Sequence, residues 1–309
     1  MARPLRIEFP GAFYHVTSRG NEKKDIFKSI RDRERFLDYL RSATERYDAT
    51  VHVYCLMTNH YHLLLETPRG NLSQIMRHIN GAYTTYYNIK RKRAGHLFQG
   101  RYKSILVEAD EYLQELSRYL HLNPVRAGMV AMPETYKWSS YPAFIGKAKP
   151  PSWLRRDFVL ECYGENITRA QEYYRNFVED LLAKEYSSPL NKTISSTVLG
   201  SADFVEQIMK VHFEKETYRP DVPAVRSLNR RFNIDEIISK TQELFPDSRV
   251  GRDVSLHLCH QYTGETLKKI GSRFGLSDSG VAKAGMRLKK QMELDSKLYD
   301  KVIEIVSHF

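Results

Sequence analysis

The order in which strand and helix patterns alternate over the first 145 residues constrains the fold more than any other feature. The predicted strands are 13–20, 51–57, 60–66 and 101–108, and the predicted helices are 31–47, 71–93 and 110–122. This β-α-β-β-α-β-α order is that of a ferredoxin-like split unit. We therefore expect an α+β fold in which helices pack on an antiparallel sheet.

Local signals support these assignments. Apolar residues of 31–47, among them Phe36 and Leu40, recur at helical spacing with charges elsewhere. The turn residues Thr58 and Asn59 join two strands closely. Asp110 is a suitable N-cap for the helix over 110–122, and we expect that helix to close before Pro124.

The composition changes after residue 145. Residues 145–153 are rich in Gly, Pro and Lys, as in a linker, and 153–232 read as mostly helical with a Ser/Thr-rich interruption. Residues 233–309 read as an all-α region. The predicted division is 1–145, 146–232 and 233–309.

The C-terminal region contains a helix-turn-helix pattern. Leu267, Ile270 and Phe274 form the apolar face of a first helix, and residues 275–277 form a turn. The helix that follows would be the recognition helix for duplex DNA, with Ser277, Asp278, Ser279, Lys283 and Arg287 as exposed candidates. An ordinary α-hairpin with Gly in its turn is the alternative. The density of Lys and Arg on both helices favours DNA binding.

The charge balance favours a polyanionic partner. The chain has 48 Lys and Arg against 37 Asp and Glu, a net charge of +11, and its 20 tyrosines suit unstacked bases. No run of about 18 apolar residues predicts a membrane span, and the N-terminus does not resemble a signal peptide. Three widely spaced cysteines fit a reducing compartment. We expect a cytoplasmic, nucleoid-associated protein.

Two histidines flank one tyrosine in the apolar stretch from Cys55 to Pro68, which reads CLMTNHYHLLLETP. In a strand His60 and His62 project to the same side, about 6–7 Å apart, and Tyr61 to the other. Two imidazoles at that separation can share one metal ion. A pair of histidines on a half-exposed sheet face is the alternative.

A later helix offers two residues that complete such a site. Tyr119 and Asn123 are four residues apart and share a helix face if the helix reaches its proline. If that helix crosses the histidine face of the sheet, Asn123 can offer its carbonyl oxygen to the metal. Tyr119 can present its hydroxyl to a group bound there, and His121 would lie off this face. The alternative roles are a core aromatic for Tyr119 and a C-cap for Asn123.

Four motifs resemble, in order and spacing, the single-tyrosine HUH transposases, and in particular the REP-associated tyrosine transposases. They are FYHVTSRGNEKKDIF, MTNHYHLLLETP, HLFQGRYKSILVE and RYLHLNPVRAGMV. The resemblance covers residues 1–145. The C-terminal region resembles, less specifically, the helix-turn-helix domain of DnaA-type replication initiators.

The resemblance implies nicking of single-stranded DNA hairpins, with the tyrosine joined to the 5′ phosphate while a 3′ hydroxyl leaves. It assigns Tyr119 as the nucleophile and His60, His62 and Asn123 as ligands of a divalent metal, for which we expect Mg²⁺ or Mn²⁺. REP-like hairpins are the implied partner. Both a monomer and a homodimer remain open.

Candidate DNA contacts lie close to these motifs. A basic cluster would contact phosphates, and nearby aromatic residues would stack on bases. The candidates are Lys90, Arg91, Lys92, Arg93, Phe98, Arg101 and Tyr102, together with Arg3, Arg19 and Asn21. A solvated helix end is the alternative for the cluster.

Two other functions stay open beside the endonuclease. One is a non-catalytic DNA-binding regulator that keeps the HUH fold as a scaffold and binds through residues 265–290. The other is replication initiation or conjugative relaxation by the same chemistry. The complete set of His60, His62, Tyr119 and Asn123 argues against a degenerate scaffold.

Overall fold

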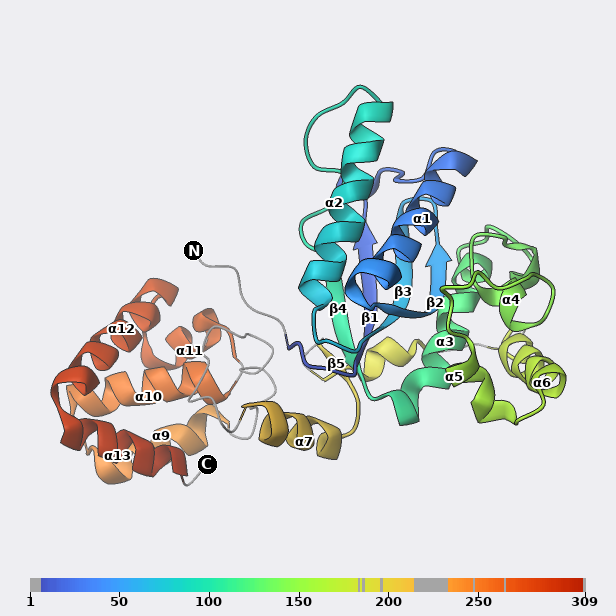
Figure 1. The fold of residues 1–309 in the computed structure, drawn as a ribbon. Coiled ribbons are helices and arrows are strands. Elements are labelled where there is room, and N and C mark those ends of the chain that lie inside the picture. Colours follow the sequence, from blue (N-terminus) through green and yellow to red (C-terminus); the bar gives the residue numbers. More distant parts are fainter. Residues whose placement is uncertain are drawn as a thin grey trace. The chain divides into compact units, whose positions relative to one another are not determined.

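The first unit of the chain is a five-stranded sheet with helices on it, seen in a computed structural model (Figure 1). The structure describes residues 7–182, 184, 187–194, 197–213, 233–246, 248–263 and 265–307. The chain forms two compact units, one of residues 8–212 and a second of 213–309, to which 1–7 are assigned. Among the described residues, no helix has the length and apolar character needed to cross a membrane.

The sheet has the strand order β2-β3-β1-β4-β5. Its strands are β1 (Ala12–Arg19), β2 (Thr50–Leu56), β3 (His60–Thr67), β4 (Lys103–Val107) and β5 (Val198–Leu199). The first four pair antiparallel, which confirms the predicted ferredoxin-like core. The two-residue β5 pairs parallel with β4, so the sheet is mixed and not purely antiparallel. A strand of two residues is too short to show the alternation of apolar and polar residues from which strands are predicted.

Helices lie on opposite faces of the sheet. Helices α1 (Ile30–Tyr47) and α2 (Leu72–Lys90) pack together on the face to which Tyr61 points, since Tyr61 contacts Phe36 of α1 and Asn80 of α2. Helix α3 (Ala109–Arg126) lies on the other face, where Tyr119 contacts His62. Because side chains alternate along β3, Tyr61 lies on the face covered by α1 and α2, and His62 lies on the face covered by α3.

The rest of this unit follows α3. Its elements are η2 (Pro133–Thr135), α4 (Tyr141–Phe144), α5 (Asp157–Leu160), η3 (Glu161–Tyr163), α6 (Ile167–Glu179), η4 (Pro189–Lys192) and α7 (Ala202–Phe213), and η1 (Asn21–Lys23) follows β1. Helix α6 packs against α3. Residues 146–212 thus belong to the same unit as the sheet.

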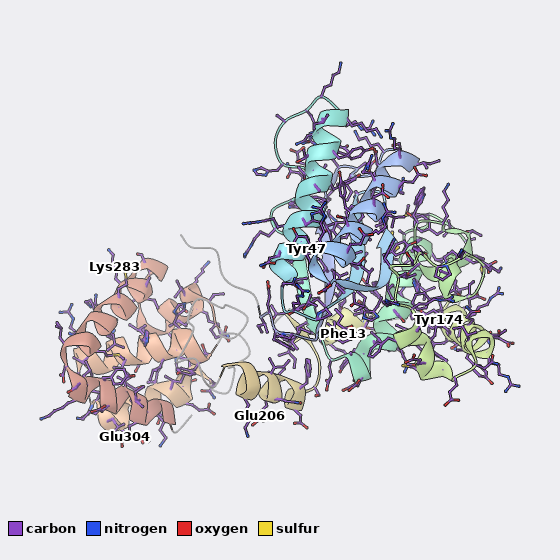
Figure 2. All side chains as sticks on the ribbon, in the orientation of Figure 1. Phe13, Tyr47, Tyr174, Glu206, Lys283 and Glu304 are labelled. Atoms are coloured by element: carbon purple, nitrogen blue, oxygen red, sulfur yellow. The ribbon has the colours of Figure 1, made fainter. Side chains whose placement is uncertain are left out.

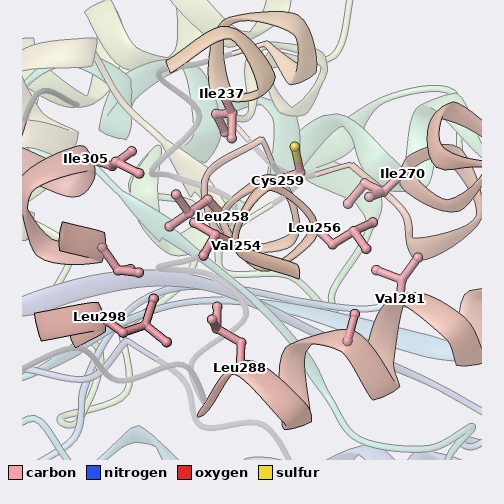
Figure 3. Packing of buried hydrophobic residues seen from close by; sticks show 12 residues of the cluster. Ile237, Val254, Leu256, Leu258, Cys259, Ile270, Val281, Leu288, Leu298 and Ile305 are labelled. Carbon is pink, nitrogen blue, oxygen red and sulfur yellow. The ribbon is translucent and has the colours of Figure 1, made fainter. Parts of the chain in front are cut away.

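The second unit is helical over all its described elements, as predicted. Its helices are α9 (Ile234–Leu244), α10 (Arg249–Tyr262), α11 (Leu267–Phe274), α12 (Asp278–Leu294) and α13 (Ser296–Ser307). They enclose an apolar core that includes Ile270, Val281 and Leu288 (Figure 3). Gly275 ends α11 with a φ of 66°, a left-handed conformation that favours glycine, and Ser277 caps α12. The predicted helix pair and its turn are therefore present.

Candidate active site and DNA-binding surface

The two histidines of β3 lie on one face of the sheet. The ring centroids of His60 and His62 are 5.0 Å apart, with the rings nearly perpendicular. Tyr61 between them is fully buried on the other face and donates a hydrogen bond of 2.6 Å to Asn80 Oδ1. This is the arrangement that strand alternation predicts.

Each imidazole is held through its Nδ1 atom. Asn59 Nδ2 donates to the Lys23 carbonyl, which turns Asn59 Oδ1 toward His60 Nδ1 at 2.7 Å. A carboxamide oxygen only accepts, so His60 donates from Nδ1 and its Nε2 keeps a lone pair. His62 Nδ1 lies 2.9 Å from His15 Nε2, with the two rings stacked. When His62 donates in that bond, its Nε2 is also free to bind a metal.

His15 is a site residue that sequence reasoning missed. It lies on β1, is 1% exposed, and its Nδ1 has no partner among the described residues. The motif FYHVTSRG contains the signal, because a histidine inside a predicted strand needs a polar partner when buried. The partner could not be identified because it lies 47 residues away.

Burial keeps these imidazoles neutral. It lowers the pKa of His60 to about 4, with a further contribution from the positive charge of Arg19. Burial, followed by the neighbouring His15 and His60, lowers the pKa of His62 well below its ordinary value. Neutral imidazole is the form that binds metal ions, so no proton has to leave at neutral pH.

Helix α3 brings Tyr119 against this pair. The Tyr119 ring meets His62 edge-on with centroids 6.3 Å apart, and the guanidinium of Arg126 lies 5.2 Å from the Tyr119 centroid. Asn123 Nδ2 donates to the Tyr119 carbonyl at 3.1 Å. This bond occupies the amide nitrogen and leaves the carboxamide oxygen of Asn123 as the atom that could bind a metal. His121 lies off this face, as predicted.

The expected end of this helix before Pro124 was wrong, because α3 continues through Pro124 to Arg126. Proline removes one N–H and disfavours helix in the preceding residue without forbidding it. The Ala127 N–H still bonds the Asn123 carbonyl at 2.9 Å. This continuation keeps Tyr119 and Asn123 on one helical face.

The donor set fits a divalent cation. His60 and His62 offer neutral imidazole nitrogens and Asn123 offers an amide oxygen, with water to complete the shell. No group of three or more His, Cys, Asp or Glu within the described ranges could hold a metal. A metal here would therefore need the amide oxygen as its third protein ligand.

The basic cluster after α2 divides into two parts. Lys90 Nζ and Arg91 Nη2 bind the fully buried carboxylate of Asp32, at 2.5 and 2.7 Å. Burial raises the pKa of Asp32, but these hydrogen bonds outweigh it and the pKa falls to about 2. Lys92 and Arg93 are exposed. The structure thus places Lys90 and Arg91 in an ion-pair network, and Lys92 and Arg93 toward solvent.

The remaining candidates of this unit differ in exposure. Phe98 is 7% exposed and packs against Tyr61 and Tyr83, a position in which its ring offers no face to a base. Arg19, Asn21 and Arg101 are exposed, and Tyr102 is half-buried with its hydroxyl 3.4 Å from Ser73 Oγ. Arg3 lies outside the described residues.

A polar cavity lies between the loop after β1 and the end of α2. Its volume is 720 Å³, and its lining includes Asn21, Lys28, Arg91 and Arg93. Asn59 bonds His60 and also the carbonyl of Lys23, which stands between the lining residues Glu22 and Lys24. The loop that lines the cavity is thus linked through Asn59 to His60.

The candidates of the second unit are also divided. Lys283 is exposed on α12 (Figure 2), whereas Arg287 makes two hydrogen bonds, of 3.0 and 2.8 Å, to the buried Asp253 of α10. Ser277 Oγ accepts from the Gly280 N–H and lies 3.1 Å from Ser279 Oγ. Ser277 therefore caps α12, Arg287 joins α12 to α10, and Lys283 faces solvent.

Comparisons with known proteins found a solved structure and a family model that match the chain. A structure described as the REP-associated tyrosine transposase bound to a REP hairpin aligns with 13% identity and a TM-score of 0.41, over 50% of this chain and 92% of that one. No curated protein matches the chain. Residues 9–123 match the family model for IS200-like transposases. His60, His62, Tyr119 and Asn123 lie within these matched residues, so the segment that carries them is similar to the IS200-like transposase family.

Proposed function

We propose that the protein is a metal-dependent endonuclease and transposase for single-stranded DNA that bears hairpins. It nicks and rejoins the strand through a 5′-phosphotyrosine intermediate. The observation that carries this proposal is the Tyr119 ring edge-on against His62, with His60 on the same sheet face. A potential nucleophile and two neutral imidazoles meet there.

The proposed reaction exchanges one phosphodiester for another. The Tyr119 oxygen attacks the scissile phosphorus and loses its proton, while the bond to the 3′ oxygen breaks and that oxygen takes up a proton. Mg²⁺ or Mn²⁺, held by His60, His62 and Asn123, would supply charge stabilisation for the phosphate. Because the phosphotyrosine retains the ester bond, a 3′ hydroxyl can reverse the step without a nucleotide cofactor.

The proposed contacts to the hairpin are the exposed candidates of the first unit and the half-buried Tyr102. Arg19 of β1 lies opposite His60 of the neighbouring strand β3, and Asn21 and Arg93 line the polar cavity after β1. Lys92, Arg101 and Tyr102 extend this set. We propose that the strand next to the scissile phosphate follows these residues, with phosphates on the cations.

The second unit has a proposed role in binding duplex DNA. The α11–α12 pair, the turn at Gly275 and the exposed Lys283 support it. A non-catalytic regulator would also use this surface, and the adduct experiment described next separates the regulator from the endonuclease.

The test incubates the full chain with hairpin-bearing single-stranded DNA, with and without Mg²⁺ or Mn²⁺. A covalent protein–DNA adduct that needs the metal and is absent from Tyr119→Phe is the expected result. The control Tyr112→Phe removes a hydroxyl from the same helix two turns away. DNA that is shifted but uncleaved, across varied hairpins and both metals, would instead favour the regulator.

A further inference from the structure

The face of α3 opposite Tyr119 is fixed by a buried polar network. His121 is fully buried, and both ring nitrogens have partners. Its Nδ1 lies 2.7 Å from the Tyr174 hydroxyl on α6, and its Nε2 lies 2.8 Å from Ser140 Oγ. His121 is two residues from Tyr119 on the same helix, so the bonds that hold its ring also hold the backbone that carries the tyrosine.

The network admits a donor arrangement in which both His121 nitrogens are paired. The Ser117 hydroxyl donates to the Gln114 carbonyl, and Tyr174 donates to Ser117 Oγ at 3.0 Å. In this arrangement Tyr174 accepts from His121 Nδ1–H, and the Ser140 hydroxyl, which can also donate to the Tyr54 carbonyl at 3.3 Å, donates to His121 Nε2. Every member is satisfied, and a satisfied buried network favours one arrangement because an altered one leaves buried groups unpaired.

Aromatic packing surrounds the same histidine. The Phe144 and Tyr141 rings lie 4.9 and 5.3 Å from the His121 ring. One turn earlier on α3, Arg118 donates to the Phe177 carbonyl at 3.1 Å and lies 3.8 Å above the Phe177 ring. Contacts from α4 and α6 thus hold α3 along two turns.

The segment that makes these contacts also covers the edge of the sheet. Strand β2 is the outer strand, and its Leu56 N–H donates to the Trp138 carbonyl at 2.9 Å. The Tyr54 and Val51 carbonyls accept from residues 140 and 155, each at 2.9 Å. Residues 136–179, which we call the brace, therefore tie α3 to the sheet that carries the histidines. They also use edge groups that another chain would need for pairing.

We propose that the brace fixes α3 so that Tyr119 faces His60 and His62 of its own chain, with His121 and Tyr174 as positioning residues. This inference rests on the proposed function, in which Tyr119 is the nucleophile. Displacement of a nucleophile by about 1 Å can lower a rate by about 100-fold. The brace contacts named above are made to α3 and to β2, so the brace would act on that position through the helix.

The test compares two tyrosines of the brace. Tyr174→Phe removes only the hydroxyl that joins His121 to Ser117. Tyr163→Phe is the matched control, because its ring lies 5.5 Å from the Tyr174 ring and its buried hydroxyl has no partner among the described residues. We expect Tyr174→Phe to form adduct about 10- to 100-fold more slowly at saturating hairpin and metal. Its affinity for the hairpin stays unchanged, and Tyr163→Phe keeps the normal rate.

Hydrogen exchange of residues 117–126 separates this proposal from the proposed function. We expect faster exchange in Tyr174→Phe than in Tyr163→Phe, whether or not any hairpin yields an adduct. If Tyr174→Phe fails to fold, Ser140→Ala removes the partner of the other His121 nitrogen. If hydrogen exchange of residues 117–126 is unchanged in Tyr174→Phe or in Ser140→Ala, the proposal that the brace fixes α3 is wrong. A normal adduct rate with altered exchange would overturn the positioning role, and an inactive wild-type chain would overturn the proposed function alone.

Discussion

Two buried polar residues of this protein, Asp32 and His15, have hydrogen-bond partners far away in the sequence. Asp32 is paired with Lys90 and Arg91, His15 with His62, and each pair joins two elements. Their roles can be tested one residue at a time.

Asp32→Asn should lower the free energy of unfolding by about 2 kcal/mol, since a buried carboxylate loses charge-assisted hydrogen bonds. The folded pKa of about 2 lies below the ordinary value of 3.8. The contribution of Asp32 is therefore complete above pH 4 and is lost as the pH falls toward 2. Urea unfolding at several pH values measures it. Asp38→Asn, which removes exposed ion pairs from the same helix, should cost at most about 1 kcal/mol.

His15→Phe should weaken Mn²⁺ binding about 10- to 100-fold, because the ring still stacks on His62 but no longer bonds its Nδ1. Calorimetric titration of the DNA-free protein measures this directly. His78→Phe, which changes a histidine bonded to Ser42 outside the site, should bind Mn²⁺ normally. Equal affinities in the two variants would exclude the proposed role of His15.

At the scale of elements, periodicity and turn chemistry predicted what depends on neighbours in sequence. Strands β1 to β4, helices α1 to α3 and the α11–α12 pair agree with the sequence patterns. The continuation of α3 through Pro124 was missed because proline disfavours helix in the preceding residue without forbidding it. The two-residue β5 and the burial of Phe98 depend on distant partners. The same holds for the site, where HYH predicted a shared face but the His15 contact could not be inferred.

The turn between α11 and α12 gives a test at this scale. Gly271→Ala should destabilise the second unit by about 2 kcal/mol, because the added methyl would overlap the backbone carbonyl of Leu276. Gly285→Ala in α12 meets only His257 Nδ1, at 3.5 Å, and should stabilise by about 0.5 kcal/mol through helix propensity. Thermal unfolding of both variants checks the prediction. Equal melting temperatures would contradict this packing of the turn.

At the scale of the molecule, one chain contains every residue of the proposed active site. Because the proposed brace would hold α3 on the sheet of its own chain, we expect the site to need no second copy, whether the protein is a monomer or a homodimer. The second unit adds a separate proposed surface for duplex DNA.

Mixing two inactive variants tests this self-sufficiency. Tyr119→Phe and His62→Ala, each without activity, should remain inactive when combined in equal amounts with hairpin DNA and Mn²⁺. Gel electrophoresis of the covalent adduct gives the result. Adduct in the mixture alone would mean that the tyrosine of one chain serves the histidines of another, against the proposed arrangement.

The most direct test of the central claim is to locate the covalent bond. Trypsin cleavage after Arg118 and Arg126 releases residues 119–126, whose only tyrosine is Tyr119. After nuclease digestion of the adduct, mass spectrometry should find a nucleotide increment on Tyr119 of this peptide, dependent on Mg²⁺ or Mn²⁺. An increment on another peptide, or unmodified 119–126 in isolated adduct, would contradict Tyr119 as the nucleophile.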